Sequence, residues 1–171
     1  FCDGFNLPIL TLVDTPGFRP GRDQEWRGMI RHGAKLAFAY AEATVPRVCV
    51  VLRKAYGGAF IVMDCKSMGN DCALAWPSAE IAVMGAKGAV EILGRRDLAA
   101  VPEGPEREAR RAALEADYEA VHLSPAAALD RGYIDEVIDP ADTRRAVAGA
   151  LAALSAKREQ LRPRRHDNIP L

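Results

Sequence analysis

The sequence lacks the features that identify several classes of protein. Its 171 residues include 23 basic and 23 acidic side chains, so it has no excess of positive charge for binding nucleic acid over its whole surface. No apolar run approaches the ~20 residues that a membrane-spanning helix requires. The four cysteines form no Cys-x-x-Cys pair, and Cys49 lies inside an apolar run, which favours a buried thiol in a reducing compartment. What remains is a globular protein of ordinary hydrophobic content, 49%.

Motifs for nucleotide hydrolysis and for side-chain nucleophiles are also missing. The string Asp14-Thr15-Pro16-Gly17 resembles a GTPase switch motif, but no GxxxxGKS/T loop accompanies it anywhere in the chain. No Ser-His-Asp or Cys-His constellation is indicated. In the predicted helix 24–43, apolar residues at helical spacing, among them Trp26, Ile30 and Gly33, form a stripe that is expected to be buried. His32 lies off this stripe, which favours a solvated or hydrogen-bonded side chain over a catalytic one.

The stretch 48–63 is the feature around which we expect the chain to be organised. A short apolar run rich in β-branched residues ends at the basic pair Arg53-Lys54, two glycines follow, and a helix is predicted from Ala59 to about Ser67. The first N–H groups of a helix have no partner within it, and the helix dipole adds partial positive charge there. Such a turn suits an oxyanion, although a tight strand-to-helix turn with no further role uses the same glycines.

An α/β fold is predicted from the alternation of short apolar runs with helical periodicity. Strands are expected at 8–13, 48–53, 74–77, 81–84 and 133–138, and helices at 24–43, 59–67, 105–122, 125–130 and 140–154. Ser124 and Asp139, each followed by proline, are the expected N-caps of the last two helices. The strand at 81–84 also runs into a glycine turn, at 85–89, before a helix begins. Strand, glycine turn and helix thus occur twice, which predicts a spiral of repeated ββα units. The basic residues 157–171 are expected to form a tail.

Several long motifs along the chain resemble one family. They are VDTPGFRPG (13–21), IRHGAK (30–35), YAEATVP (40–46), RKAYGGA (53–59), the stretch 75–88 and the closing stretch 164–171. Over nearly its whole length the chain resembles the carboxyltransferase β subunit of biotin-dependent acyl-CoA carboxylases, and the propionyl-CoA and acetyl-CoA carboxylase branch is nearest. The stretch 125–135 also looks like the crotonase superfamily, to which these subunits belong.

The resemblance implies a fold, an activity and partners. The fold is a crotonase/ClpP-like spiral of ββα units, and residues 1–171 match the second, C-terminal half of the family's subunit. No initiator methionine opens the chain, so we expect it to be part of something longer. The implied activity moves a carboxyl group from carboxybiotin, on a separate carrier domain, to the α-carbon of a short-chain acyl-CoA such as propionyl-CoA. The implied partners are acyl-CoA, the biotin carboxyl carrier or biotin carboxylase subunit, and further copies of the subunit in a hexamer. No metal, nucleic acid or membrane is implied. The implied location is the cytoplasm, or the mitochondrial matrix in a eukaryote.

The resemblance also implies roles for the residues of the glycine turn. By position, the backbone N–H groups of Gly58 and Ala59 form the oxyanion hole for the ureido oxygen of biotin. The biotin-binding stretch as a whole comprises Tyr56, Gly57, Gly58, Ala59 and Phe60. Ile61 occupies the family position that is associated with the choice of acyl chain, so it is expected in the substrate pocket.

Three alternatives stay open at the level of the sequence. A crotonase-type hydratase, isomerase or decarboxylase needs a placed carboxyl group as acid or base, and the candidates near the turn are Asp64 and Glu80, neither of which has an obvious partner in the sequence. A biotin-dependent decarboxylase or transcarboxylase uses the same biotin site. In the third alternative, the chain has no activity by itself and serves only to assemble with other chains.

Overall fold

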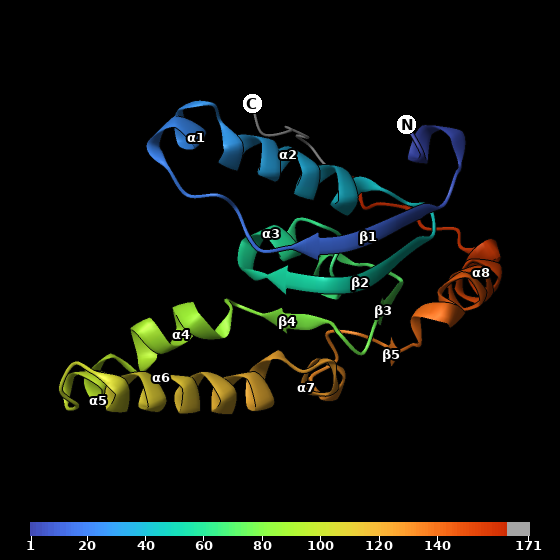
Figure 1. Ribbon diagram of the computed structural model, residues 1–171. Helices are drawn as coiled ribbons and strands as arrows, with labels where there is room; N and C mark the ends of the chain where they lie inside the picture. The colour runs from blue at the N-terminus through green and yellow to red at the C-terminus, as the bar shows by residue number, and fades with distance from the viewer. Residues whose placement is uncertain (164–171) are drawn as a thin grey trace.

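The computed structural model describes residues 1–163, and within them one parallel sheet organises the chain (Figure 1). Its strands are β1 (Ile9–Thr15), β2 (Arg47–Tyr56), β3 (Cys72–Ala75), β4 (Glu80–Ala82) and β5 (Glu136–Val137). They adjoin in the order β1-β2-β3-β5, while β4 pairs with the last residues of β2. Every one of these pairings is parallel. The α/β class predicted from the sequence is therefore confirmed, and the structure shows that the sheet is parallel.

Helices cover the sheet and stand at both of its ends. They are α1 (Arg22–Trp26), α2 (Met29–Glu42), α3 (Gly57–Ile61), α4 (Ala86–Leu93), α5 (Arg95–Ala99), α6 (Pro105–Tyr118), the π-helical turn η3 (Glu119–Leu123), α7 (Pro125–Asp130) and α8 (Thr143–Ala153). Figure 1 shows α1 and α2 on one side of the sheet and α4 to α6 on the other. Helix α3 lies at the carboxyl end of β2, and α8 lies toward the opposite end of the strands. No helix within the described residues is both long and apolar enough to cross a membrane.

The core is built on β2, because both faces of this strand are buried. Cys49 and Val51 face one side, toward β3 and α7. Val48 and Val50 face the other side, where Val147 of α8 covers them. A strand that is buried on both faces reads as a continuous apolar run, which is the pattern seen in the sequence. Cys49 is fully buried, which confirms the buried thiol predicted from the sequence, and its burial raises the pKa of the thiol to about 12.

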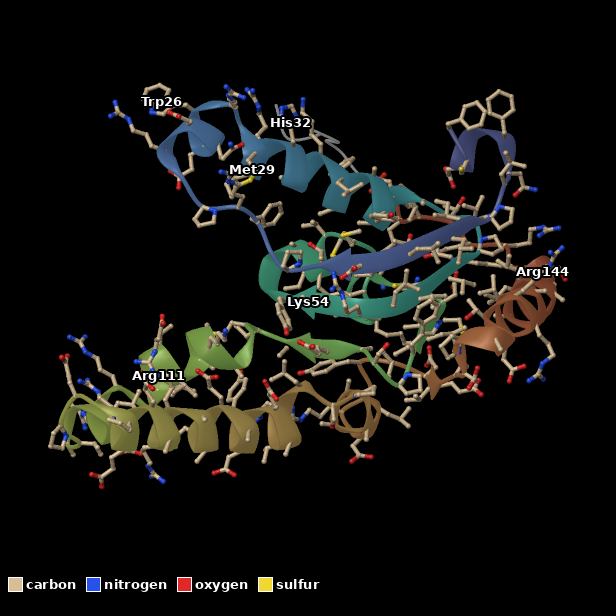
Figure 2. The ribbon with its side chains drawn as sticks, in the orientation of Figure 1. Trp26, Met29, His32, Lys54, Arg111 and Arg144 are labelled. Atoms are coloured by element: carbon tan, nitrogen blue, oxygen red, sulfur yellow. The ribbon has the colours of Figure 1, made fainter. Side chains whose placement is uncertain are left out.

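The prediction of one helix over 24–43 was wrong in detail. The chain breaks between α1 and α2, because Gly28 adopts a left-handed conformation with φ of +78°. The predicted buried stripe is also incomplete, since Gly33 is buried but Trp26 and Ile30 remain 79% and 62% exposed. Figure 2 shows Trp26 at the outer end of α1, away from the sheet. Apolar residues at helical spacing identify a helix, but they do not show which part of it is covered.

Two boundaries next to the glycine turn also differ from the prediction. Strand β2 continues through the basic pair to Tyr56, because Asp14 of β1 accepts hydrogen bonds from the Arg53 guanidinium and the Lys54 N–H, which hold the strand end in place. Helix α3 ends at Ile61 and not near 67, because Asp64 adopts φ of +63°, which no helix continues.

The C-terminal third follows the sequence signals more closely. The Ser124 hydroxyl accepts from the Ala127 N–H and the Asp139 carboxylate from the Ala141 N–H, so both predicted caps are confirmed. The strand expected at 133–138 is reduced to β5, which pairs with only two residues of β3. Lys157 is anchored through its ammonium group, which lies 2.9 Å from the Asp71 carboxylate. Residues 164–171 of the predicted tail lie outside the described residues.

Candidate functional site

The glycine turn follows β2 directly, and its first residue has to be glycine. Gly57 adopts φ of +59°, a left-handed conformation that side chains disfavour. A Cβ atom at this position would also lie 2.9 Å from the carbonyl oxygen of Val83. The two constraints are independent, and together they exclude any other residue without a shift of the backbone. The chain therefore reverses its direction at Gly57 and enters α3 at once.

Two backbone N–H groups are left free at the start of α3. The N–H groups of Gly58 and Ala59 lie in the first turn, where no carbonyl of the helix accepts from them. Within residues 1–163, neither group donates to any other backbone or side-chain oxygen. The Ala59 side chain is buried, whereas Gly58 is exposed. Two adjacent unpaired donors beside an open surface form an arrangement that can stabilise an oxyanion. The sequence predicted this pair of donors, and the helix begins slightly earlier than expected.

The loop after β1 brings a phenyl ring to this turn, which the sequence analysis missed. A Cβ atom at Gly33 of α2 would lie 2.9 Å from the Phe18 ring, and one at Gly58 would lie 3.8 Å from it. The ring thus lies between α2 and the glycine turn. Asp14 anchors the loop, and the hydrogen bond from Arg53 holds the pKa of the Asp14 carboxyl below its ordinary value. Nothing in the proline- and glycine-rich sequence of this loop indicated what the ring contacts.

A groove of about 320 Å³ opens on the side of the turn that faces β4. Its lining is mainly apolar, with basic and hydroxyl groups among it: Gly57, Phe60, Ile61, Cys65, Lys66, Ser67, Ile81, Ala82, Val83, Tyr118, His122, Arg131 and Tyr133. Ile61 is 48% exposed, so it faces the groove and is not an interior isoleucine. The apolar lining suits an organic ligand beside the two N–H donors.

The two carboxylates near the turn, for which the sequence showed no obvious partner, are both engaged in the structure. Asp64 is fully buried, lies 2.6 Å from the Arg47 guanidinium and accepts a second hydrogen bond from Asn70. Glu80 accepts a hydrogen bond from the Tyr56 hydroxyl. Neither carboxylate lines the groove. The partners are distant in sequence, which is why the local pattern did not reveal them.

In the part of the chain that the structure describes, neither His32 nor a cluster of metal-ligating side chains adds to the groove. His32, which the sequence placed off the buried stripe, is exposed on α2. No group of three or more His, Cys, Asp and Glu side chains within the described residues could hold a metal ion. The chemistry that the site offers is therefore the pair of backbone donors, the groove beside them and the phenyl ring that adjoins Gly58.

Comparison with known proteins places the chain among enzymes of one kind. The family model of the carboxyl transferase domain matches residues 1–169. The propionyl-CoA carboxylase beta chain of Saccharopolyspora erythraea is 59% identical over 172 residues, which cover 100% of this chain and 32% of that relative. The biotin-dependent acetyl-/propionyl-coenzyme A carboxylase beta5 subunit of Mycobacterium tuberculosis is 53% identical, covering 99% of this chain and 31% of that subunit.

A solved structure agrees with these relatives. The crystal structure of transcarboxylase 12S, reported with its hexamer assembly and with methylmalonyl-coenzyme A bound, superposes with a TM-score of 0.93 at 49% identity. The match covers 100% of this chain and 32% of the 12S chain. The chain thus spans about a third of the length of the proteins that it matches.

Proposed function

This chain belongs to the carboxyl transferase domain family, and from that premise we propose that it moves a carboxyl group from carboxybiotin to the α-carbon of a short-chain acyl-CoA such as propionyl-CoA. The family membership predicted from the sequence motifs is confirmed, and the parallel α/β fold is crotonase-like, as in transcarboxylase 12S. The single observation that supports the proposed activity most strongly is the pair of unpaired N–H groups at Gly58 and Ala59, in the turn whose residues Gly57 and Phe60 line the groove.

The residues of the turn fit a biotin head group. Gly58 and Ala59 would hold its ureido oxygen, and Tyr56, Gly57 and Phe60 complete the surrounding turn. When bound, biotin supplies the carboxyl group and, after giving it up, a basic nitrogen that takes the α-proton of the acyl-CoA. The two N–H groups stabilise negative charge on the ureido oxygen, because fixed donors need no reorganisation as the charge develops.

This role requires no acid or base from the side chains of this chain. Asp64 is already paired with Arg47, and Glu80 with Tyr56, so neither carboxylate is free to move a proton in the groove. A hydratase or isomerase of the crotonase type needs such a group within hydrogen-bond reach of its substrate. The engaged state of both carboxylates therefore favours carboxyl transfer over these alternatives.

The proposal includes a second crotonase-like half, a biotin carrier and a hexamer. The first half would supply most of the acyl-CoA contacts and the donors for the enolate oxygen, while residues 1–171 supply the biotin side. Support comes from the relatives, since one is named as biotin-dependent and another is described with a hexamer assembly. Large apolar side chains on the surface, such as Trp26, Ile30 and Leu12, are consistent with such association.

Transfer of labelled carboxyl groups tests the proposed function. We expect residues 1–171 alone to carboxylate no acyl-CoA above a heat-treated control, because the enolate donors are absent, and we expect activity when the first half and the carboxylated carrier are added. Size-exclusion chromatography of the same samples reports association. Turnover by the isolated chain, or none by the assembled protein, would contradict the proposal. Carboxyl transfer that proceeds with methylmalonyl-CoA as the donor, in place of the carboxylated carrier, would identify a transcarboxylase. This is the activity for which a relative 49% identical to this chain is named.

Ile61 is expected to influence which acyl chain is accepted. Its half-exposed side chain lines the groove one turn after the N–H donors, where an acyl group would approach. In the assembled enzyme, Ile61→Asp is expected to change the ratios of kcat/KM among acetyl-, propionyl- and butyryl-CoA. One methylene in such a pocket is worth ~1–3 kcal/mol, so a shift of ~10-fold is within reach. Unchanged ratios would remove Ile61 from the acyl pocket, and Ile61→Leu, which keeps the groove apolar and the number of carbon atoms the same, is the matched control.

A further inference from the structure

The side chain of Tyr56 faces β4 and α4, although the residue is part of the glycine turn. Tyr56 is the last residue of β2 and is only 8% exposed. Its hydroxyl donates a hydrogen bond to the Glu80 carboxylate on β4, and the ring does not line the groove. In the parallel pairing of β2 with β4, Lys54 lies opposite Glu80 and Tyr56 opposite Ala82, so the bond runs diagonally between the two strands. Tyr56 therefore links the turn to the segment that follows it.

Gly85 provides the space that the Tyr56 ring occupies. The backbone of Gly85 has φ of −69°, a conformation open to every residue, so it does not itself require glycine. A Cβ atom there would lie 3.2 Å from Cε2 of Tyr56 and 3.4 Å from its hydroxyl oxygen. Contacts this close force a neighbour to shift. Gly85, in the second glycine turn at 85–89, therefore leaves room for the ring of Tyr56, the residue that precedes the first glycine turn.

Residues from the start of α4 and from η3 enclose the ring further. Tyr56 forms a small buried cluster with Ala86 and Leu123, against which Ala82 and Tyr118 pack. Figure 1 shows β4 running beneath the end of β2 and leading into α4. The ring is thus held by its hydroxyl at one end and by packing along its faces, so the backbone at Tyr56 has little freedom to rotate.

We propose that Tyr56, Glu80 and Gly85 are positioning residues that aim the N–H groups of Gly58 and Ala59. The inference rests on the proposed function, since it concerns the same oxyanion site. Tyr56 directly precedes Gly57, where the chain reverses at φ of +59°, so a rotation at Tyr56 re-aims both N–H groups that follow. Glycine has no side chain to restrict its backbone dihedral angles, so the side chain of Tyr56 is left to hold the turn in one conformation. None of these three residues lines the groove.

Substitution of the hydrogen-bonded pair gives the first test, in the assembled enzyme. Tyr56→Phe keeps the ring and removes the bond, and it is expected to lower kcat about 10- to 100-fold with little change in the KM for acyl-CoA, because small misplacements of a reacting geometry cost rates of this order. Glu80→Ala is expected to behave in the same way. Glu80→Gln keeps an oxygen that accepts from the hydroxyl, so it is expected to retain most of the activity. A role in folding alone would lower Tm in all three variants without this split between kcat and KM.

Two glycine substitutions give a matched second test. Gly85→Ala pushes against the Tyr56 ring, whereas a Cβ at Gly88, one turn further along α4, meets only the Met84 sulfur at 3.8 Å, an ordinary contact. Both changes replace glycine by alanine at unstrained backbone positions, so their effects on the unfolded chain are alike. Gly85→Ala is expected to lower kcat, and Gly88→Ala is expected to leave it close to that of the wild type.

The outcomes separate this inference from the proposed function. An active wild-type enzyme whose Tyr56→Phe and Gly85→Ala variants keep a normal kcat would overturn the positioning role and leave carboxyl transfer intact. A wild-type assembly that transfers no carboxyl group to any acyl-CoA would overturn the proposed function, and the positioning role with it. A selective fall in kcat in Tyr56→Phe, Glu80→Ala and Gly85→Ala, with Glu80→Gln and Gly88→Ala near normal, supports the inference.

Discussion

Replacing Ala59 by proline is expected to lower kcat for carboxyl transfer by ~10²–10³-fold, the usual cost of one oxyanion donor. Proline has no N–H, so the substitution deletes one of the two unpaired groups at the start of α3. Proline is sterically acceptable in the first turn of a helix, which gives the fold a good chance of surviving. Affinity for acyl-CoA is expected to change little, because the first half is proposed to hold most of the CoA. The measurement is kcat and acyl-CoA affinity in the assembled enzyme.

Ala59→Ser is the control, because it keeps the N–H and adds only a hydroxyl group. Its kcat is expected to stay close to that of the wild type. Proline also restricts the residue before it, so Gly58 is re-aimed to some extent and both donors contribute to the expected loss. Circular dichroism and oligomer size show whether each variant has folded. A correctly folded Ala59→Pro enzyme with near-normal kcat would show that this turn serves the architecture only.

Replacing Arg47 by methionine is expected to destabilise the chain by about 3–5 kcal/mol, the usual cost of breaking a buried ion pair from one side. Arg47 is 3% exposed, and its guanidinium group lies 2.6 Å from the fully buried Asp64 carboxylate. The same guanidinium donates to the carbonyl oxygens of Met68 and Gly69. Methionine fills part of the volume, but it leaves the carboxylate without a counter-charge. The free energy of unfolding in urea, followed by circular dichroism, measures the loss.

Two variants show whether the loss comes from the buried charge. Arg53→Met, on the same strand, breaks an ion pair with Asp14 in which the arginine is 63% exposed, and it is expected to cost at most ~1 kcal/mol. Combining Arg47→Met with Asp64→Asn removes the uncompensated charge, so it is expected to recover part of the stability. Equal losses for Arg47→Met and Arg53→Met would contradict the assignment.

Because Arg47 and Asp64 form a buried ion pair, the loss of stability in Arg47→Met is expected to depend on pH. Burial raises the pKa of Asp64 above its ordinary value, against the opposing hydrogen bonds of Asn70 and Arg47. Removing Arg47 raises it further, so the folded variant binds a proton more readily than the unfolded chain does. A raised folded-state pKa favours the folded state at low pH, and this contribution is lost as the pH rises through that pKa. The destabilisation by Arg47→Met is therefore expected to be smallest in acid and to grow toward neutral pH.

The sequence was sufficient for the elements that depend on local pattern. The continuous apolar run of β2, the glycines after it and the caps at Ser124 and Asp139 were all recognised, because each depends on residues within a few positions of one another. The family motifs reinforced these assignments across nearly the whole chain. The N–H donors of the turn follow directly from where a strand ends and a helix begins.

The contacts that complete the site depend on residues far apart in sequence, and the local pattern does not reveal them. Arg47 and Asp64 are separated by 17 positions, and Tyr56 and Glu80 by 24. A glycine in the sequence does not indicate which side chain fills the space that it leaves. Gly33 accommodates Phe18, and its neighbours along α2 give no sign of this. The exposure of Trp26 was missed for a related reason, because a helical stripe does not show what covers it.

The most direct measurement of the central claim is the infrared frequency of the ureido carbonyl of biotin, labelled with ¹³C, when the biotinylated carrier is bound to the assembled enzyme. If the N–H groups of Gly58 and Ala59 donate to this oxygen, removing one donor weakens the polarisation of the carbonyl bond. A higher frequency is expected in Ala59→Pro than in the wild type, with Ala59→Ser matching the wild type. The same frequency in all three proteins, with carrier shown to be bound, would contradict it.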